Sequence, residues 1–255
     1  MNKPKISIIT ITYNSEKTLE ETIKSVISQD YDNLEYLIID GKSTDGTLDI
    51  VEKYRNKISF VLSEPDRGIS DAFNKGIKYA TGEIIGIINS DDLLLPDALK
   101  TIARNYDSTV DVYRGNTIRW DDVNNIKTRS IPSMNFPAKS IKKRKICHQS
   151  TFITKRAYDK LGFFDINLKY MMDADLLIRL YEAKTKWKYV NADLAISRSG
   201  GVTDRHSFWK KRHESYTIIK KNGGGDSYAF FYMTYFLVRQ FCKKVAIALG
   251  IRKLL

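Results

Sequence analysis

Two adjacent aspartates, Asp91 and Asp92, follow the apolar run Ile84–Ile88 after a short Asn89-Ser90 spacer. Adjacent carboxylates repel each other unless a cation lies between them, and a divalent cation that also binds phosphate is the usual solution. A solvated turn that caps the next helix is the alternative. Because three other predicted strands also end in polar loops, the sequence favours a metal and phosphate site at this pair.

Polar segments follow the other predicted strands. They are Thr12–Asn14, Asp40–Gly46 and Glu64–Gly68. The ring of Tyr13 could stack on a nucleobase, and the carboxylate of Asp40 could accept hydrogen bonds from the edge of a base. The alternatives are a core aromatic at a strand end for Tyr13 and an Asx turn for Asp40.

A second group of acids lies in the segment Tyr170–Leu180, whose apolar residues have helical spacing. Asp173 falls in the first turn of the expected helix, where it could act as a base or merely cap the helix. Asp175 and Arg179 are four residues apart, which favours an ion pair along the helix.

Apolar, β-branched runs alternate with amphipathic stretches over the first hundred residues. The expected strands are Ile6–Ile11, Tyr36–Ile39, Ile58–Leu62 and Ile84–Ile88. The expected helices are Thr18–Ser28, with Ser15 as its N-cap, Thr47–Tyr54, Ile69–Ala80 and Asp97–Tyr106. This alternation predicts an α/β fold with a mostly parallel, Rossmann-like sheet flanked by helices on both faces. Ligands of such sheets bind at the carboxyl ends of the strands, where the polar loops lie.

Composition and motifs exclude several classes of protein. With 42% apolar and 28% charged residues, the chain is not disordered, collagen-like or a disulfide scaffold. No G-x-G-x-x-G follows the first strand and no G-x-x-x-x-G-K-[ST] occurs, which argues against a dinucleotide dehydrogenase and a P-loop protein. No run approaches the roughly 20 apolar residues of a membrane span, and the N-terminal apolar run reads as a strand, so we expect a cytoplasmic location.

The two parts of the chain differ in charge. The net charge of +12 divides into −5 for residues 1–100 and +17 for residues 101–255. An acidic part that could hold a cation is therefore joined to a basic part that favours an anionic partner.

Two long segments carry a family resemblance. ISIITITYNSEKTLEETIKSVISQDYDNLEYLIIDGKSTDGT and SEPDRGISDAFNKGIKYATGEIIGIINSDDLL resemble the family-2 glycosyltransferases of GT-A fold. The resemblance covers about residues 5–100 and returns near residues 148–179. It implies inverting, metal-dependent transfer of a sugar from a nucleoside diphosphate sugar, most commonly a UDP-sugar, to an acceptor hydroxyl. The acceptor it implies is a sugar or lipid-linked sugar of a bacterial surface polysaccharide or glycolipid.

The resemblance also implies roles for individual residues. The residues implied to bind the sugar nucleotide are Thr12, Tyr13, Asn14, Asp40, Asp66 and Asp91. Asp91 and Asp92 would hold Mn²⁺ or Mg²⁺, and Asp173 would be the catalytic base. The residues expected on the acceptor side or elsewhere in the site are His148, Asp175, Arg179, Arg205 and His206.

Two departures from the family pattern leave alternatives open. The family often has an aspartate at the position of Asn89 and a glutamate at that of Met172. Their loss is compatible with an inactive, nucleotide-sugar-binding subunit of a synthase complex. A sugar nucleotidyltransferase is a further alternative, but it would need a glycine-rich loop after the first strand, and TITYNSEK has none.

The C-terminal part is basic and aromatic. We expect a glycosyltransferase domain over residues 1–205, with a nucleotide-sugar half at 1–107 and an acceptor half at 108–205. Residues 206–255 would form a basic, amphipathic helical extension that lies on an anionic membrane, at the inner face of the cell membrane, or packs in a homodimer. No nucleic-acid-binding motif accompanies these residues, so we expect no nucleic acid partner.

Overall fold

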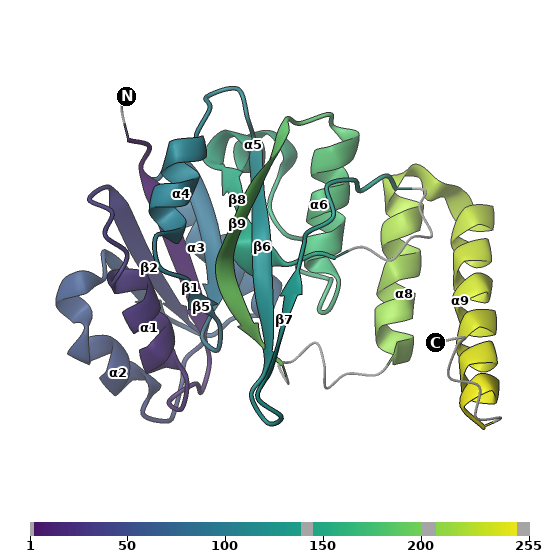
Figure 1. Ribbon diagram of the computed structural model, residues 1–255, viewed down its shortest axis with the longest axis horizontal. Helices are drawn as coiled ribbons and strands as arrows, with labels where there is room; N and C mark the ends of the chain where they lie inside the picture. The colour runs from purple at the N-terminus through teal and green to yellow at the C-terminus, as the bar shows by residue number, and fades with distance from the viewer. Residues whose placement is uncertain (1–2, 139–144, 200–207, 249–255) are drawn as a thin grey trace.

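The computed structural model describes residues 3–138, 145–199 and 208–248. The strands are β1 (Ile6–Thr12), β2 (Leu34–Asp40), β3 (Phe60–Ser63), β4 (Ile84–Asn89), β5 (Leu93–Leu94), β6 (Val112–Asp121), β7 (Ile126–Ser130), β8 (Thr151–Thr154) and β9 (Trp187–Arg198). The α-helices are α1 (Leu19–Ile27), α2 (Thr47–Lys53), α3 (Ile69–Tyr79), α4 (Ala98–Asn105), α5 (Lys155–Leu161), α6 (Met172–Glu182), α8 (Phe208–Ile219) and α9 (Gly225–Ala248). All the strands join one sheet (Figure 1).

The N-terminal half of the sheet is parallel, as the alternation of strands and helices predicts. Strands β3, β2, β1 and β4 lie side by side in that order. Every residue of β1 is buried, which is typical of a parallel strand covered by helices on both faces. The register pairs Thr12 with Asp40 and Ile11 with Asn89, so the polar ends of three strands meet at one edge.

The C-terminal half of the sheet differs from the prediction of a mostly parallel sheet. Strand β8 joins β4 in the antiparallel direction and separates it from β6, which pairs antiparallel with β7 and parallel with β9. A short turn joins β6 to β7, and two strands joined in this way must run antiparallel. The sheet is therefore mixed: β1 to β4 pair in parallel, as do β6 and β9, whereas β5, β7 and β8 pair antiparallel with their neighbours.

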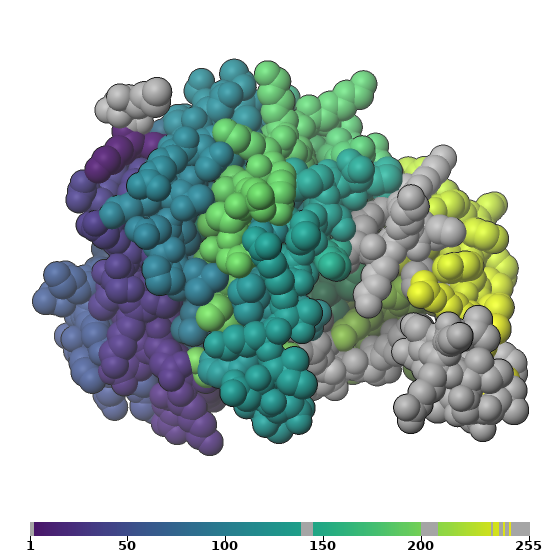
Figure 2. All heavy atoms as spheres, viewed as in Figure 1, coloured from purple at the N-terminus to yellow at the C-terminus, as the bar shows by residue number. Residues whose placement is uncertain are grey.

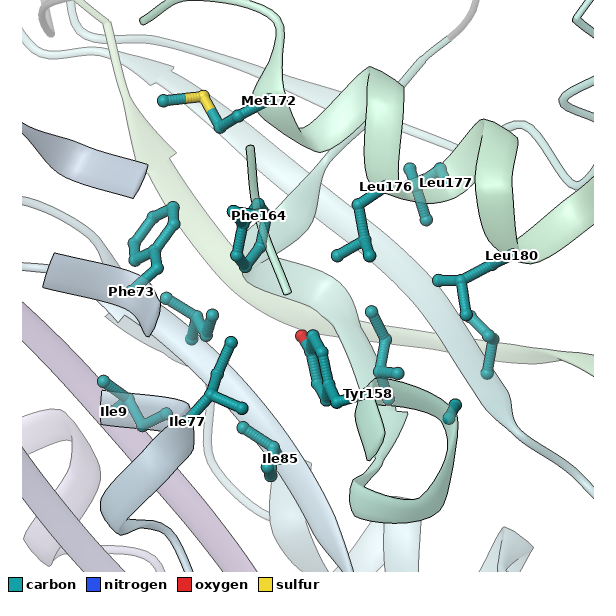
Figure 3. Close-up of a cluster of buried hydrophobic side chains, with 14 of the residues drawn as sticks. Ile9, Phe73, Ile77, Ile85, Tyr158, Phe164, Met172, Leu176, Leu177 and Leu180 are labelled. Carbon is teal, nitrogen blue, oxygen red and sulfur yellow. The ribbon is translucent and has the colours of Figure 1, made fainter. Parts of the chain in front are cut away.

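Helix α6 is fixed to the sheet by its apolar face. Figure 3 shows side chains of α6 pointing toward α3 and the sheet. The labelled members of this buried cluster are Ile9, Phe73, Ile77, Ile85, Tyr158, Phe164, Met172, Leu176, Leu177 and Leu180. Because burial of each large apolar side chain stabilises the fold by about 1.5–3 kcal/mol, this packing holds the first turn of α6 in place.

Two helices, α8 and α9, lie at the end of the molecule opposite β2 and β3 (Figures 1 and 2). Ile218 of α8 is buried in the same cluster as the apolar face of α6, so α8 packs on the sheet domain. The turn Lys220–Gly224 joins the two helices, and Ala229 of α9 is fully buried. Within the described residues, no helix is both long and apolar enough to cross a bilayer. The helical character expected for residues 206–255 is confirmed for the part described.

Candidate active site

The loop after β1 is tied to the loop after β2 by Asn14. Its backbone N–H donates to the hydroxyl of Ser43 (2.8 Å), and its side-chain oxygen accepts from the backbone N–H of Thr44 (2.9 Å). Asn14 has a φ of +48°, a left-handed conformation that asparagine tolerates better than most residues. Asn14 therefore holds the two loops together.

The carboxylate of Asp40 is fully buried and bonded within its own surroundings. It accepts hydrogen bonds from the backbone N–H groups of Lys42 (3.1 Å) and Ser43 (3.0 Å) and from the hydroxyl of Ser63 (2.6 Å). This geometry corresponds to the turn-forming alternative for Asp40. A direct contact between Asp40 and a base stays a prediction.

Tyr13, Gly41 and Asp66 meet at the ends of the first three strands. A Cβ atom on residue 41 would lie 2.6 Å from Asp66 Oδ2 and 3.4 Å from Tyr13 Cδ2, so a larger residue would displace the Asp66 carboxylate from this position. Tyr13 is 62% exposed, which excludes the core-aromatic alternative. The other oxygen of Asp66 accepts from the backbone N–H of Gly68 (2.7 Å). The exposed ring of Tyr13 and the carboxylate of Asp66, next to the backbone of Gly41 with no side chain between them, suit a flat, hydrogen-bonding ligand such as a nucleobase.

Ser15 links this region to the aspartate pair. Its hydroxyl lies 2.8 Å from the hydroxyl of Ser90, which precedes Asp91. The prediction that Ser15 caps the first helix is wrong, because α1 begins after Thr18 and the Ser15 side chain is bonded to the β4 loop instead. The loops after β1, β2 and β4 thus form one connected edge.

The two aspartates after β4 differ in their surroundings. Asp92 is 2% exposed, and its oxygens accept from the side-chain amide of Gln149 (2.8 Å) and the backbone N–H of Arg198 (3.1 Å). Burial and the neighbouring charge of Asp91 raise the pKa of Asp92 to about 6. Asp91 is only partly buried. Asp91 is therefore better placed than Asp92 to reach a ligand.

Three polar atoms at this edge are buried without a hydrogen-bond partner among the described residues. They are Thr12 Oγ1, Asn89 Oδ1 and His148 Nε2. Thr12 and Asn89 end the neighbouring strands β1 and β4. Since a buried unsatisfied polar atom costs about 1–3 kcal/mol, each of these atoms needs a partner, which a bound ligand, an ion or an ordered water can supply.

Oxygen atoms of Asp91 and Asn89 fit a hard divalent cation in their chemistry. In the part of the chain that the structure describes, no three histidine, cysteine, aspartate or glutamate side chains are grouped to hold a metal ion. A cation bound by one or two of these oxygens would complete its shell with phosphate oxygens and water, as Mg²⁺ does at nucleotide sites.

His148 and Asp173 form a close pair, with His148 Nδ1 3.0 Å from Asp173 Oδ2. Asp173 lies in the first turn of α6, as predicted, and His148 begins a short 3₁₀ turn, His148–Ser150. Burial by itself would lower the pKa of His148, but the hydrogen bond and charge of Asp173, with the charges of Asp92 and Asp91, outweigh burial and raise that pKa. The pair therefore favours a charged imidazole beside the carboxylate.

Consecutive residues connect the two acidic groups of the site. His148 contacts Asp173, while Gln149, the next residue, donates to Asp92. Residue type and local spacing do not indicate a role for Gln149, Ser90 or Gly41. Each acts through a contact with a residue distant in the chain, which residue type and local spacing do not reveal.

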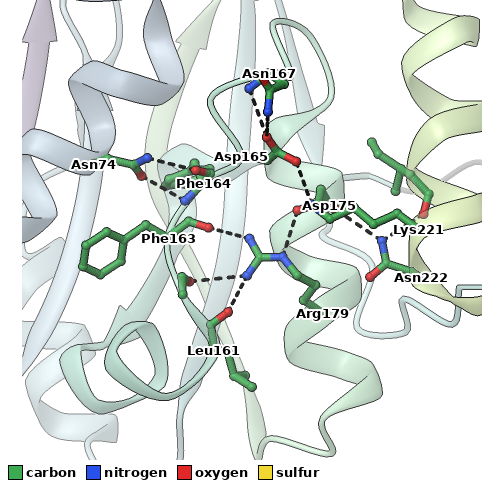
Figure 4. A network of polar contacts seen from close by, with 12 residues as sticks. Asn74, Leu161, Phe163, Phe164, Asp165, Asn167, Asp175, Arg179, Lys221 and Asn222 are labelled. Carbon is green, nitrogen blue, oxygen red and sulfur yellow. Dashed lines mark hydrogen bonds and ion pairs between the residues drawn. The ribbon is translucent and has the colours of Figure 1, made fainter.

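Asp175 and Arg179 form the predicted ion pair along α6, with 2.8 Å between Nε and Oδ2. Asp175 is fully buried, and Arg179 also donates to the carbonyl oxygens of Leu161 (2.7 Å) and Phe163 (2.6 Å) (Figure 4). These contacts give the pair a structural role, and contact with an acceptor stays a prediction. The other two expected site residues, Arg205 and His206, lie outside the described residues.

Comparison with known proteins identifies the family. Residues 7–162 match the model of glycosyl transferase family 2. The chain is 31% identical to EpsE of Bacillus subtilis strain 168, a protein described as a glycosyltransferase, over 70% of this chain and 67% of EpsE. It is 39% identical to the poly(ribitol-phosphate) β-N-acetylglucosaminyltransferase TarS of Staphylococcus aureus strain Mu50, over 39% of this chain but only 18% of TarS.

Solved structures share the fold. The crystal structure of S. aureus TarS residues 1–349 in complex with UDP-GlcNAc has a TM-score of 0.67 at 21% identity, over 98% of this chain and 76% of that one. A mannosyltransferase of Pyrobaculum calidifontis in complex with GDP-Man and Mn²⁺ has a TM-score of 0.66 at 18% identity, over 99% and 82%. The sheet, its flanking helices and the family match together show that this chain is a glycosyltransferase of GT-A fold and belongs to glycosyl transferase family 2.

Proposed function

We propose that this glycosyltransferase is an inverting, metal-dependent enzyme that transfers a sugar from a UDP-sugar to an acceptor hydroxyl. One observation carries the proposal: neighbouring residues His148 and Gln149 hold Asp173 and Asp92, respectively. A proton acceptor thereby lies beside the acidic loop at the carboxyl ends of β1 and β4.

The nucleotide occupies the loops after β1, β2 and β3. The base lies on Tyr13 and against Asp66, above the bare backbone of Gly41, and Asp40 and Asn14 shape the loops beneath it. The complex of TarS with UDP-GlcNAc supports uracil as the base.

The diphosphate lies at the end of β4. Asp91 and Asn89 would contribute oxygen ligands to Mn²⁺ or Mg²⁺. Asp92, also predicted from the sequence as a metal ligand, is buried and would position their loop through its bonds to Gln149 and Arg198. When bound, the cation neutralises charge that develops on the departing diphosphate. The Mn²⁺ in the similarly folded mannosyltransferase supports this assignment.

Asp173 takes the proton of the acceptor hydroxyl as that oxygen attacks the anomeric carbon from the face opposite the diphosphate. His148 orients the carboxylate through its 3.0 Å contact. Met172, which replaces the glutamate of the family pattern, is 5% exposed in the core beneath α6, so this departure concerns packing. The departure therefore gives little support to an inactive subunit.

The test of the base is Asp173→Asn. This variant keeps the shape but loses the proton acceptor, so turnover falls by about 10²-fold or more, while UDP affinity measured by calorimetry stays unchanged. Asp159→Asn, at an exposed position of α5, is the matched control and keeps full activity. An active Asp173→Asn variant would exclude Asp173 as the base. Wild-type protein that binds UDP-sugars but never forms a product would identify the inactive subunit.

The test of the metal is Asp91→Asn. Wild-type protein binds UDP more tightly with Mn²⁺ than with EDTA, and the variant loses most of this difference because one anionic ligand is gone. Calorimetric titrations of UDP with and without Mn²⁺ measure both affinities. A wild-type affinity that is indifferent to EDTA contradicts metal dependence.

The acceptor belongs to a bacterial surface polysaccharide or glycolipid, in keeping with the polymer named for TarS. The outer face of α9 supports a peripheral position on an anionic membrane. Phe231, Tyr235, Val238 and Val245 recur at helical spacing along this face, and each is at least 37% exposed.

A further inference from the structure

A shallow cavity of about 470 Å³, largely open to solvent, lies between α8 and the loop that leads into α6. Its lining residues are Lys169, Tyr170, Trp209, Lys210, His213 and Glu214. Tyr170 precedes Asp173 by three residues, and three residues of chain span at most about 11 Å. The cavity is therefore close to the catalytic base.

The cavity is positively charged. Both carboxylate oxygens of Glu214 form hydrogen bonds with the loop: they accept from the backbone N–H groups of Lys169, Tyr170 and Met171, each at 2.9 Å. Among the residues that the structure describes, neither Lys169 nor Lys210 forms an ion pair, and both are exposed. Two ammonium groups against the single carboxylate of Glu214 leave the lining with a net positive charge, which attracts an anionic ligand.

Aromatic rings complete the wall of the cavity. Trp209 is 60% exposed, and Tyr170 lies on the loop opposite. The negative face of an aromatic ring attracts polarised C–H groups, such as those of a sugar ring. Aromatic rings that can pack on a sugar, next to lysines that can bind an anion, thus suit a saccharide that carries negative charge.

We propose that this cavity binds the acceptor next to its reacting sugar, and that the acceptor carries an anionic group, a phosphodiester or a carboxylate. This inference rests on the proposed transfer to an acceptor. Lys169 and Lys210 bind the anionic group, and Trp209 packs on a sugar ring. Glu214 holds the loop between the cavity and Asp173.

Three oligomers of matched length test the proposal in binding assays with the full chain: a glycerol phosphate oligomer, an oligosaccharide that contains glucuronic acid, and a neutral maltooligosaccharide. At least one anionic oligomer binds about tenfold more tightly than the neutral one, and added salt weakens its binding. The oligomer that binds identifies phosphate or carboxylate as the anionic group.

The variant Lys169→Gln with Lys210→Gln removes the two charges. Its affinity for the anionic oligomer falls about tenfold, while its affinity for the neutral one is unchanged. Lys57→Gln with Lys78→Gln, two exposed lysines distant from the cavity, is the charge-matched control and keeps wild-type affinity. Trp209→Ala weakens the binding of all oligomers.

Two results would overturn the proposal: wild-type protein that binds neither anionic oligomer better than the neutral one, or equal affinities for the two lysine double variants. UDP affinity is measured in every sample. Wild-type protein that does not bind UDP would contradict the proposed function. Wild-type protein that binds UDP but gives either overturning result would contradict only the proposal that the cavity binds an anionic acceptor.

Discussion

At the scale of single residues, the pair of His148 and Asp173 links the stability of the fold to pH. The carboxylate and the surrounding acidic charges raise the pKa of His148 above its ordinary value near 6.5. A group whose pKa is raised by folding stabilises the native state fully below its unfolded pKa. That contribution is lost as pH rises through the folded pKa.

We expect His148→Gln to remove this pH-dependent contribution. The difference in free energy of unfolding between wild type and variant is greatest below pH 6.5, the ordinary pKa of the unfolded imidazole, and shrinks as the pH rises through the raised pKa of the folded state. Urea unfolding of wild type and variant at several pH values measures this difference in the free energy of unfolding. A difference that stays constant over this range would show that His148 is not charged in the native state.

Residue types and spacing lead to some site residues but not to others. Asp91 and Tyr13 stand at strand ends, where the pattern of elements predicts a ligand, whereas the role of Asp173 as the base is implied by the family resemblance. Gln149 reaches Asp92 across 57 positions of the chain, and Ser90 reaches Ser15 across 75. These contacts depend on how distant loops meet, so the local sequence does not reveal them.

At the scale of elements, α6 combines an apolar face with a buried ion pair. Arg179 neutralises Asp175 and also binds the carbonyl groups at the end of α5, while Lys221 (3.7 Å) and Asn222 (3.2 Å) reach Asp175 from the α8–α9 turn (Figure 4). The ion pair on α6, the helix that carries Asp173, therefore connects α6 to the end of α5 and to the turn between α8 and α9.

Arg179→Met leaves the Asp175 charge buried without its main partner and should lower the free energy of unfolding by about 3–5 kcal/mol. Adding Asp175→Leu removes the unpaired charge and restores part of the loss. The control is Arg129→Met, which breaks an exposed ion pair with Asp193 and costs about 1 kcal/mol or less. Urea unfolding compares all three, and equal losses for the two arginine variants would contradict a structural role for Arg179.

The order of the elements is predictable only where local pattern decides it. Each expected strand and helix of the first hundred residues is present, with ends shifted by a few residues; β3, for example, begins at Phe60, because the short helix Arg55–Lys57 precedes it. The insertion of β8 between β4 and β6 follows from packing between distant segments. No periodicity in the sequence encodes this order.

At the scale of the whole molecule, the exposed apolar face of α9 is expected to bind a second surface, which we propose is an anionic membrane. We expect Phe231→Glu with Val238→Glu to reduce partition onto anionic vesicles at least tenfold at low salt, because burial of these side chains drives the association. Co-sedimentation with vesicles measures it.

The matched control is Val123→Glu with Ile126→Glu, which changes two exposed apolar residues of the β6–β7 hairpin without affecting partition. Wild-type protein that ignores anionic vesicles at low salt would contradict the membrane assignment. A change from dimer to monomer in light scattering of the α9 variant would then identify a second copy of the chain as the partner.

The adjacency of His148 and Gln149 limits how this enzyme can change over evolution. In a turn with three residues per revolution, one inserted residue would rotate one of the two side chains about 120° away from its partner. Insertions and deletions are therefore excluded from this turn, although the tip of the β6–β7 hairpin can tolerate them.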